Sequence, residues 1–503
     1  MNEKKISAYR RIMSSTAIFG GAQVLNILVN IIRAKLVAHI LHSTGMGISS
    51  VFNSAANTIQ QFALMGLNVS AVPPISQANN DANPNVLAFT VRLVRRIVLL
   101  ASLLGLVITI LFSPVFSATS FNDQSHIPYF LLLSLAVFFN VMGMGEMAVM
   151  QGLRKYKMLA FCSTVPPLCG LMLSVPIYFI WGIEGIVPAM IAGNLIYFIV
   201  IRLLSYRHKK EIPQEKISIK TMWTQGRGII KFGAIMTLGS LIGTLTTYAL
   251  IAFINNIGST EDVGFYQACN VITVQYTGLV FTAMATDYFP NLSNLIKTNT
   301  QEAFRAVNQQ TEITMLIITP LAMLLILTAP LVIRILLTEE FLNIERMVCF
   351  MGMATVLRAL CFARDYIIYA KGDNKIIFWV ETVWGSAKTF IIMSLFYYFL
   401  GLDGLGYGAL CVSVIEVIIS LILIPWRYQF RFTRKTINLI SITTLMATIC
   451  LLGSQIPSTL EKYTVMGSVT AICIVYCTIQ LNKRMNLRAM LSQYKNKYKK
   501  EEN

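Results

Sequence analysis

Residues 12–76 read IMSSTAIFGGAQVLNILVNIIRAKLVAHILHSTGMGISSVFNSAANTIQQFALMGLNVSAVPPIS, which is two apolar spans on either side of a short glycine turn. A looser copy lies about 217 residues downstream. Four residues recur there at one constant offset from their counterparts Gly47, Asn53, Pro73 and Ser76, namely Gly264, Asn270, Pro290 and Ser293. A match over two consecutive spans indicates that a bundle was doubled, and duplicated bundles of membrane helices are mostly transporters.

The composition is that of a membrane protein. Hydrophobic residues make up 55% of the 503 and charged residues 13%, whereas a soluble chain carries about 25% charged residues. Apolar runs of about 20 residues predict fourteen spans, at 14–38, 47–72, 87–112, 128–150, 159–180, 184–205, 228–254, 263–289, 309–335, 347–370, 376–399, 405–425, 436–453 and 464–481. The polar connections are too short to fold alone, which excludes an enzyme with a soluble catalytic lobe.

The net charge of +18 is distributed as the positive-inside rule requires. Lys and Arg concentrate in both tails and in alternate loops, and the loop 202–231 holds the largest group. The pattern places both termini in the cytoplasm and supports an even number of spans. The basic segments therefore hold the topology and meet anionic lipid headgroups, and no nucleic-acid partner is predicted.

The nine cysteines lie within or beside apolar spans and show no metal-ligand spacing. We interpret them as small packing residues, so the sequence predicts neither a metal site nor any other cofactor. The first span is too long for a signal peptide, and no small-residue cleavage site flanks it; it is interpreted as an uncleaved anchor.

A matching turn supports the duplication. The fifth and sixth spans meet at Gly182-Ile183-Glu184-Gly185, and the eleventh and twelfth meet at Gly401-Leu402-Asp403-Gly404. Because each half contains an even number of spans, the two halves are expected to run parallel with a cavity between them. The predicted segments are a bundle at 1–205, a basic linker at 206–227, a second bundle at 228–430, two additional helices at 431–482 and a basic tail at 483–503.

The first two spans are more polar than lipid tolerates. Gln23, Asn26 and Asn30 share one helical face with Arg33, while Lys35 lies about 200° round the helix from Arg33. This face is expected to look toward protein or water. The second span carries further amides and is predicted to end at Pro73-Pro74, because proline removes backbone donors that hydrocarbon cannot replace.

Charged side chains inside the later spans need shelter from lipid, since each costs roughly 2.5–3.5 kcal/mol at mid-bilayer. Two shelters stay open: cross-pairing of Arg358 and Asp365 with Glu381 and Lys388, or a wet cavity that receives an anion. Arginine forks and lysines suit a pyrophosphate, so the candidate substrate-binding residues are Arg33, Lys35, Arg358, Arg364 and Lys388. Lone acids suit exchange of H+ or Na+, and the candidates are Glu146, Glu381 and Asp287.

The run from Arg33 to Leu41, the turn Gly45-Met46-Gly47 and the polar span ending near Pro73 resemble the start of polysaccharide transporters of the multidrug/oligosaccharidyl-lipid/polysaccharide (MOP) exporter superfamily. The closest group is the O-antigen flippases. This resemblance implies an all-α membrane protein of about fourteen transmembrane helices, with two parallel six-helix repeats around a central cavity plus two extra C-terminal helices. The family's first-span arginine, which faces the cavity in relatives, matches Arg33.

The resemblance further implies a bacterial inner-membrane protein that flips an undecaprenyl-pyrophosphate-linked oligosaccharide to the outer leaflet by alternating access. Other polysaccharide assembly proteins are candidate partners. Lipid II flippases place an acid directly after the first-span arginine, where this chain has Ala34. Multidrug antiporters of the superfamily move cations, which clustered arginines would repel. A membrane enzyme of polysaccharide assembly is the remaining alternative; the four scattered histidines, His39, His42, His126 and His208, do not favour it.

Overall fold

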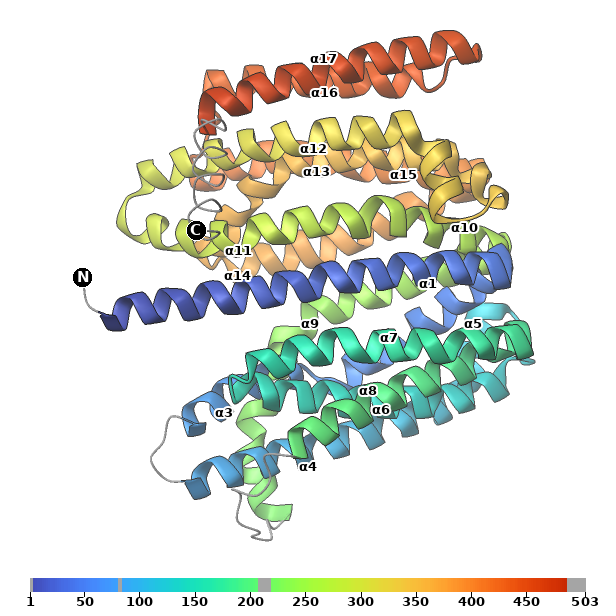
Figure 1. The fold of residues 1–503 in the computed structure, drawn as a ribbon, viewed down its shortest axis with the longest axis vertical. Helices are drawn as coiled ribbons and strands as arrows, with labels where there is room; N and C mark the ends of the chain where they lie inside the picture. Colours follow the sequence, from blue (N-terminus) through green and yellow to red (C-terminus); the bar gives the residue numbers. More distant parts are fainter. Residues whose placement is uncertain (1–2, 80–83, 207–218, 486–503) are drawn as a thin grey trace, which may run out of the picture. The chain divides into compact units, whose positions relative to one another are not determined.

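The computed structural model describes residues 3–79, 84–206 and 219–485 (Figure 1). Over these ranges the chain is helical and contains no strand. Nine helical segments among them are long and apolar enough to cross a membrane. The predicted all-helical, multi-pass membrane protein is therefore confirmed at this level. By its internal contacts the chain forms two compact units, residues 1–267 with 336–338 and residues 268–335 with 339–503.

Unit 1 contains a long bent helix and the elements that pack around it. Proline lies in the first turn of α5 and of α6, where its missing N–H costs nothing. The elements are α1 (Glu3–Leu64), α2 (Leu67–Ser70), α3 (Val72–Asn79), α4 (Pro84–Leu111), α5 (Ser113–Phe121), α6 (Ile127–Gly152), α7 (Tyr156–Trp181), η1 (Gly182–Gly185), α8 (Ile186–Tyr206), α9 (Ile219–Ile257) and most of α10 (Thr260–Asn270).

Unit 2 is built on α13, a helix that is buried over most of its length. Two π-helical segments, η3 and η5, interrupt the regular helices of this unit. The elements are η3 (Val271–Gln275), α11 (Tyr276–Thr298), α12 (Thr300–Leu336), η4 (Glu339–Ile344), α13 (Glu345–Lys371), α14 (Asn374–Ile376), η5 (Ile377–Trp384), α15 (Gly385–Tyr428), α16 (Arg434–Gly453) and α17 (Thr459–Met485).

The second predicted span ends earlier than the sequence suggested. The chain leaves α1 at Met65 and Gly66, both with positive φ. A Cβ on Gly66 would lie 2.3 Å from the Gly233 carbonyl oxygen, so α9 approaches too closely for any side chain there. Pro73 and Pro74 instead lie in the first turn of α3, where proline is tolerated. The prediction that the proline pair ends the span was therefore wrong.

Polar residues that the repeat relates to one another are in contact within unit 1. Thr44 Oγ1 donates to Glu261 Oε1 at 3.3 Å, and Ser50 Oγ donates to Gln267 Oε1 at 3.3 Å. In both pairs the partners are 217 residues apart, which is the offset of the sequence repeat. A residue that meets its own counterpart lies beside a local two-fold axis. These contacts support the predicted duplication.

The repeated glycines meet in the same reciprocal way. A Cβ on Gly47 would lie 1.8 Å from the carbonyl oxygen of Thr260, and a Cβ on Gly264 would lie 2.0 Å from that of Ser43. Ser43 and Thr260 are themselves counterparts at the same offset. Because the obstructing atoms are backbone, only glycine permits this approach of α1 to α10.

The repeated G-[IL]-[DE]-G turn adopts one conformation in both copies. Gly182 has φ 54° and ψ −131°, and Gly401 has φ 61° and ψ −143°. Both values fall in a region that side chains rarely enter. Gly185 and Gly404, three residues later, each lie against a carbonyl oxygen of the preceding helix. The predicted equivalence of the two turns is confirmed in the backbone.

We expect Gly401→Ala to destabilise the protein by about 1–3 kcal/mol, because alanine cannot adopt this φ and ψ without strain. No neighbour lies within 4 Å of the added methyl group, so strain is the only cost. Thermal unfolding of the purified protein measures the effect. The control is Gly193→Ala, also with open space around the new methyl but inside a regular helix; it should be neutral or stabilising. Equal unfolding midpoints for the two variants would contradict the assignment.

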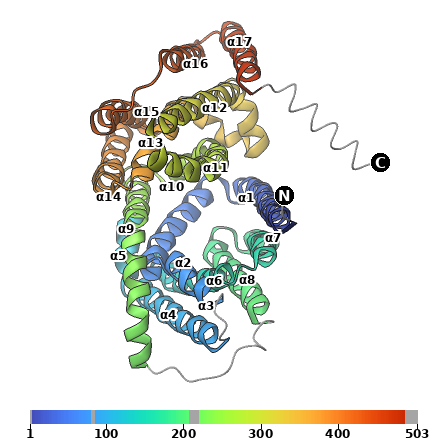
Figure 2. The same cartoon turned by 90° about the vertical axis from the view of Figure 1, so that its left-hand side faces the viewer.

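Within unit 2 the last two helices pack on each other, and α16 also packs on α13. Figures 1 and 2 show α16 beside α17. Glu312 of α12 accepts from Thr436 Oγ1 at 2.7 Å and from Arg484 Nε at 2.6 Å. At the other end, Lys462 Nζ donates to Glu345 Oε1 at 2.6 Å. Charged side chains therefore tie α16 and α17 to α12 and α13.

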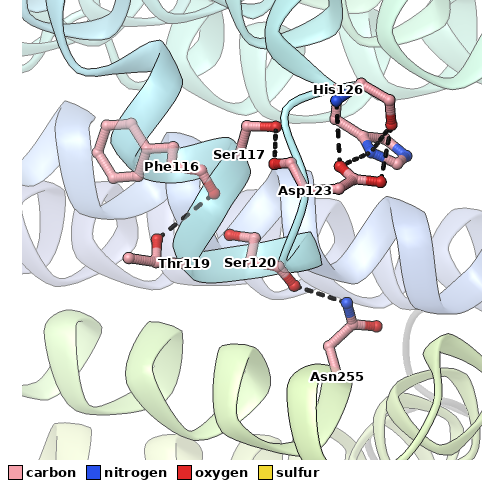
Figure 3. A network of polar contacts seen from close by, with 8 residues as sticks. Phe116, Ser117, Thr119, Ser120, Asp123, His126 and Asn255 are labelled. Atoms are coloured by element: carbon pink, nitrogen blue, oxygen red, sulfur yellow. Dashed lines mark hydrogen bonds and ion pairs between the residues drawn. The ribbon is translucent and has the colours of Figure 1, made fainter.

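The end of α5 is capped by the end of α9 in unit 1 (Figure 3). Asn255 Nδ2 donates to the Ser120 carbonyl oxygen at 2.6 Å, and Asn256 Nδ2 donates to that of Thr119 at 2.7 Å. The Tyr248 hydroxyl lies 2.8 and 2.9 Å from the hydroxyls of Thr119 and Ser120. Carbonyl oxygens at the C-terminal end of a helix have no partner within the helix. The bonds from Asn255 and Asn256 supply such partners and join α9 to α5.

The loop between α5 and α6 folds around Asp123 (Figure 3). The Ser117 hydroxyl donates to the Asp123 carbonyl oxygen at 2.8 Å, and His126 Nδ1 lies 3.0 Å from the Asp123 carboxylate. Hydrogen bonds from His126 and Ser125 lower the pKa of Asp123 below its usual value. The loop is thus ordered by local polar contacts, and His126 has a structural partner.

Candidate functional site

Unit 2 contains a cavity of about 500 Å³ between α11, α13, η5 and α15. Its wall combines charge with aromatic surface, which is the usual character of a small-molecule site. The ionisable lining residues are Arg358, Asp365, Glu381 and Glu416, and the aromatic ones are Phe281, Phe289, Phe362, Tyr366 and Tyr369.

One face of α13 supplies much of this wall. Positions 358, 362, 365, 366 and 369 repeat at helical spacing and line the cavity together. Arg358 is exposed, although the seven residues before it are all buried. The aromatic rings pack in a chain, with 5.0 Å between the centroids of Phe281 and Phe362 and 5.2 Å between Phe362 and Tyr366. The arginine therefore stands at the cavity beside a rigid aromatic surface.

The three carboxylates of the cavity have different surroundings. Asp365 accepts from Ser420 Oγ and lies 4.0 Å from Arg364 Nε. Glu416 lies 3.6 Å from Lys388 Nζ. Glu381 has no ion-pair partner within 4.0 Å among the residues that the structure describes. Of the three acids, Glu381 is therefore the one that lines the cavity without a cation of the described residues within 4.0 Å.

Glu381 lies inside the π-helical segment η5, and the cavity residues Gly278 and Phe281 follow η3 closely. Short π-helical segments interrupt α-helices mostly at functional sites, because the extra residue loosens the backbone hydrogen-bond ladder. Both interruptions in unit 2 thus adjoin the same cavity. In the described part of the chain, no three acid, His or Cys side chains lie close enough to hold a metal ion.

The cross-paired network proposed from the sequence is not formed. Lys388 pairs with Glu416 rather than with a residue of α13, and Asp365 has Arg364 as its neighbour. The reason is geometric: Glu381 and Lys388 lie two turns apart on one segment, and the π-helix of η5 shifts the face on which Glu381 projects. Sequence spacing assumed a regular helix there.

Arg364 lies beside the cavity but not on its surface. Its side chain is 1% exposed, and its guanidinium carbon is 5.4 Å from the centroid of the Phe432 ring. Nη2 contacts the Cys361 sulfur at 3.4 Å, while Nε and Nη1 have no hydrogen-bond partner among the residues that the structure describes. Lys388 is also buried, at 6% exposed. Arg364 and Lys388 are therefore buried next to Asp365 and Glu416, and neither cation lines the cavity.

The candidate site residues predicted in unit 1 are Arg33, Lys35 and Glu146, and none of them lines the cavity of unit 2. Arg33 and Lys35 are exposed on α1. Glu146 is buried on α6, where Arg95 and Arg202 bind its carboxylate and Ser205 Oγ donates to it at 2.9 Å. The structure thus gives Glu146 a complete set of partners. Asp287 falls on α11 of unit 2, and its side chain is outside the described residues.

Sequence reasoning missed Glu416 and the aromatic wall. Glu416 was an isolated acid in an apolar span, and its partner Lys388 is on the other side of the bend at Gly401. The aromatic residues did carry a signal, since Phe362, Tyr366 and Tyr369 follow helical spacing. That pattern is also typical of a packed core, so only the cavity distinguishes the two.

A model of the polysaccharide biosynthesis protein family matches residues 88–346, more than half of the chain. A comparison with curated protein sequences found no match. Among solved structures, the chain is similar to the lipid II flippase MurJ in an inward closed conformation. The TM-score is 0.68, with 13% identity, covering 93% of this chain and 99% of that one.

Two further solved structures share the fold. An inward-facing multidrug resistance MATE family transporter of the MOP superfamily has a TM-score of 0.63 and 15% identity, covering 80% of this chain and 95% of that one. A MOP superfamily transporter from Pyrococcus furiosus has a TM-score of 0.55 and 16% identity, covering 82% and 93%. At these identities the similarity shows a common fold. It does not show a common substrate.

Proposed function

Since the chain belongs to the polysaccharide biosynthesis protein family and has the fold of MOP-superfamily transporters, we propose that it is a flippase. Its substrate is an undecaprenyl-pyrophosphate-linked oligosaccharide, such as an O-antigen or another surface polysaccharide repeat unit. The protein moves it from the cytoplasmic to the outer leaflet of the bacterial inner membrane. Both termini are on the cytoplasmic side, as the distribution of Lys and Arg favours.

The proposed architecture has about fourteen transmembrane helices, in two parallel six-helix repeats at 1–205 and 228–430 around a central cavity, plus two C-terminal helices. The reciprocal contacts at Gly47 and Gly264 support the repeats, as do the matching turns at Gly182 and Gly401. Two of the nine apolar segments, of 48 and 55 residues, bend at those turns and are each long enough for two spans.

The pyrophosphate group is proposed to be bound by Arg33, Lys35 and Arg358. All three are exposed although they lie in apolar helices, and a guanidinium matches phosphate oxygens in both charge and geometry. The aromatic wall beside Arg358 offers apolar contact area for sugar rings. The buried Arg364 and Lys388 instead balance Asp365 and Glu416, which keeps two acids in place beside Glu381.

The proposal of ion coupling rests on the carboxylate of Glu381. It lines the cavity and has no ion-pair partner among the described residues. A carboxylate that is neutralised only by its own ligand can take up a cation on one side of the membrane and release it on the other. We propose H+ as this ligand, because a single carboxylate is sufficient to bind and release a proton. Na+ is the alternative.

We expect Arg33→Ala to abolish export of the surface glycan while the protein level stays unchanged. Losing a charge-assisted contact to phosphate costs about 1.5–3 kcal/mol, which is about 10- to 150-fold in transport. A deletion strain complemented with the variant shows this as loss of the glycan on the cell surface. Arg334→Ala, another exposed arginine of an apolar helix, is the control. Normal glycan in the Arg33 variant would remove Arg33 from the site.

A second candidate function is efflux of cationic drugs. The cavity of unit 2 has three acids against one base on its wall, which suits a cation better than an anion. If this is the function, a deletion strain becomes sensitive to cationic dyes and keeps its surface glycan. If the flippase proposal holds, the same strain loses the glycan and its dye sensitivity is unchanged.

A further inference from the structure

In unit 1, α4 and α8 both pack against α6 (Figure 1). A second charged cavity is lined by residues of these three helices. It centres on Glu146, whose side chain is 3% exposed. Arg95 contacts both carboxylate oxygens, Nε at 2.9 Å from Oε1 and Nη2 at 2.9 Å from Oε2. Arg202 Nη1 binds Oε1, and Arg95 Nη2 also donates to Ser205 Oγ at 2.6 Å.

These contacts leave a surplus of positive charge. The cavity has a volume of about 170 Å³ and is lined by three arginines, Arg95, Arg96 and Arg202, against the single carboxylate of Glu146. An ion pair that served only to neutralise a buried acid would need one arginine. Arg95 and Arg202 together carry two positive charges against the one negative charge of Glu146, so a positive charge remains at the wall of the cavity.

The two arginines that hold Glu146 keep donors available. Each guanidinium has five N–H donors in a fixed plane. Arg202 uses Nη1 for Glu146, and its Nε and Nη2 have no partner among the described residues. Arg95 similarly uses Nε and Nη2. Because the buried carboxylate fixes both side chains, the remaining donors are preorganised for an acceptor with several oxygens.

The surroundings of the cavity indicate contact with lipid. Arg202 lies four residues before the end of α8, and Glu146 six residues before the end of α6, which is on the order of 6–9 Å along a helix. Leu99 lines the cavity and is 41% exposed, and Leu203, next to Arg202, is 63% exposed. Charge near helix ends beside exposed leucines is the pattern of a headgroup zone.

We propose that this cavity binds the phosphate group of an anionic phospholipid. The guanidinium donors of Arg95 and Arg202 contact the phosphate oxygens, Arg96 adds charge, and the acyl chains lie along Leu99 and Leu203. Glu146 is a positioning residue, which holds the two arginines without touching the lipid. The site is lined by residues of unit 1 alone and does not depend on which substrate the protein transports.

Native mass spectrometry of the detergent-purified full chain tests this, with phosphatidylglycerol, phosphatidylcholine and inorganic phosphate added separately. We expect a retained phosphatidylglycerol and weaker binding of the zwitterionic lipid. Arg202→Gln should weaken phosphatidylglycerol binding about five- to tenfold, since each basic residue near a headgroup contributes about 1 kcal/mol. Glu146→Gln should also weaken it, because a neutral amide cannot hold both guanidinium groups and their free donors lose preorganisation.

The matched control is Arg154→Gln. Arg154 lies just beyond the end of α6, where its Nη2 donates to the Ser76 hydroxyl at 3.0 Å, and it does not line the cavity; phosphatidylglycerol binding should be unchanged in this variant. Equal binding by Arg202→Gln and the wild type would overturn the site. Equal affinity for inorganic phosphate and for the lipid would overturn the lipid assignment. If Arg202→Gln does not fold, Arg202→Lys keeps the charge without the fork, and the expected result is weaker binding.

Discussion

Cross-linking of a Thr44→Cys, Glu261→Cys pair will stop transport completely, and cleavage of the cross-link will restore it. The native side chains at these positions are in contact, with 3.3 Å between Thr44 Oγ1 and Glu261 Oε1. Residues 44 and 261 are counterparts in the two proposed repeats, so we expect the proposed alternating-access movement to separate them once per cycle. A short bis-methanethiosulfonate reagent is used on a chain whose nine cysteines have been replaced; each new cysteine thiolate displaces methanesulfinate and forms a reducible disulfide with the linker.

The control pair is Asn140→Cys, Asn194→Cys. Asn140 Nδ2 donates to Asn194 Oδ1 at 2.8 Å, and the two residues lie on α6 and α8, which both belong to the proposed first repeat at 1–205. A bundle that moves as a rigid body keeps this distance, so cross-linking there should leave transport unchanged. Continued transport with residues 44 and 261 fully cross-linked would exclude an opening movement at that contact.

Glu381→Gln is expected to reduce transport more than about tenfold, which corresponds to a loss of about 1.4 kcal/mol or more. Glutamine has the shape of the protonated acid and cannot release a proton, so the exchange step stops. The substitution breaks no ion pair with a described residue, and the protein should fold normally. Transport in proteoliposomes with an imposed pH difference measures the effect.

In the wild type, transport should follow the pH difference, and in Glu381→Gln the residual rate should not. Glu339→Gln is the control, since this acid is 83% exposed and lies outside the cavity. If Glu381→Gln transports at the wild-type rate, Glu381 is not the coupling residue. If a Na+ difference drives transport and a pH difference does not, H+ coupling is excluded while the acid keeps its role.

The helices were largely predictable because hydrophobic length determines them. The predicted spans 87–112, 128–150 and 436–453 agree closely with α4, α6 and α16. The equivalent turns at Gly182 and Gly401 were predictable for another reason. A positive φ beside a tight helix contact requires glycine, so the same glycine pattern occurs at both turns in the sequence. Pro73 misled, since proline ends one helix and begins the next equally well.

The site was less predictable because side-chain partners depend on tertiary contacts. Glu146 was an isolated acid in the sequence, yet Arg95 and Arg202 reach it from helices 51 and 56 residues away. The sequence predicted that Arg358 and Glu381 need shelter from lipid, and in the structure both residues line one cavity. The π-helix that carries Glu381 leaves no signature in composition, because it concerns backbone hydrogen bonding alone.

Movement of the lipid-linked oligosaccharide between leaflets can be measured in cells depleted of the protein. A membrane-impermeant lectin then reports how much of the undecaprenyl-pyrophosphate-linked oligosaccharide is accessible from the outer face. Depletion should lower the labelled fraction at least about tenfold while the total pool rises, and the wild-type chain, but not Arg33→Ala, should restore it. An unchanged labelled fraction after depletion would contradict the proposed flippase function.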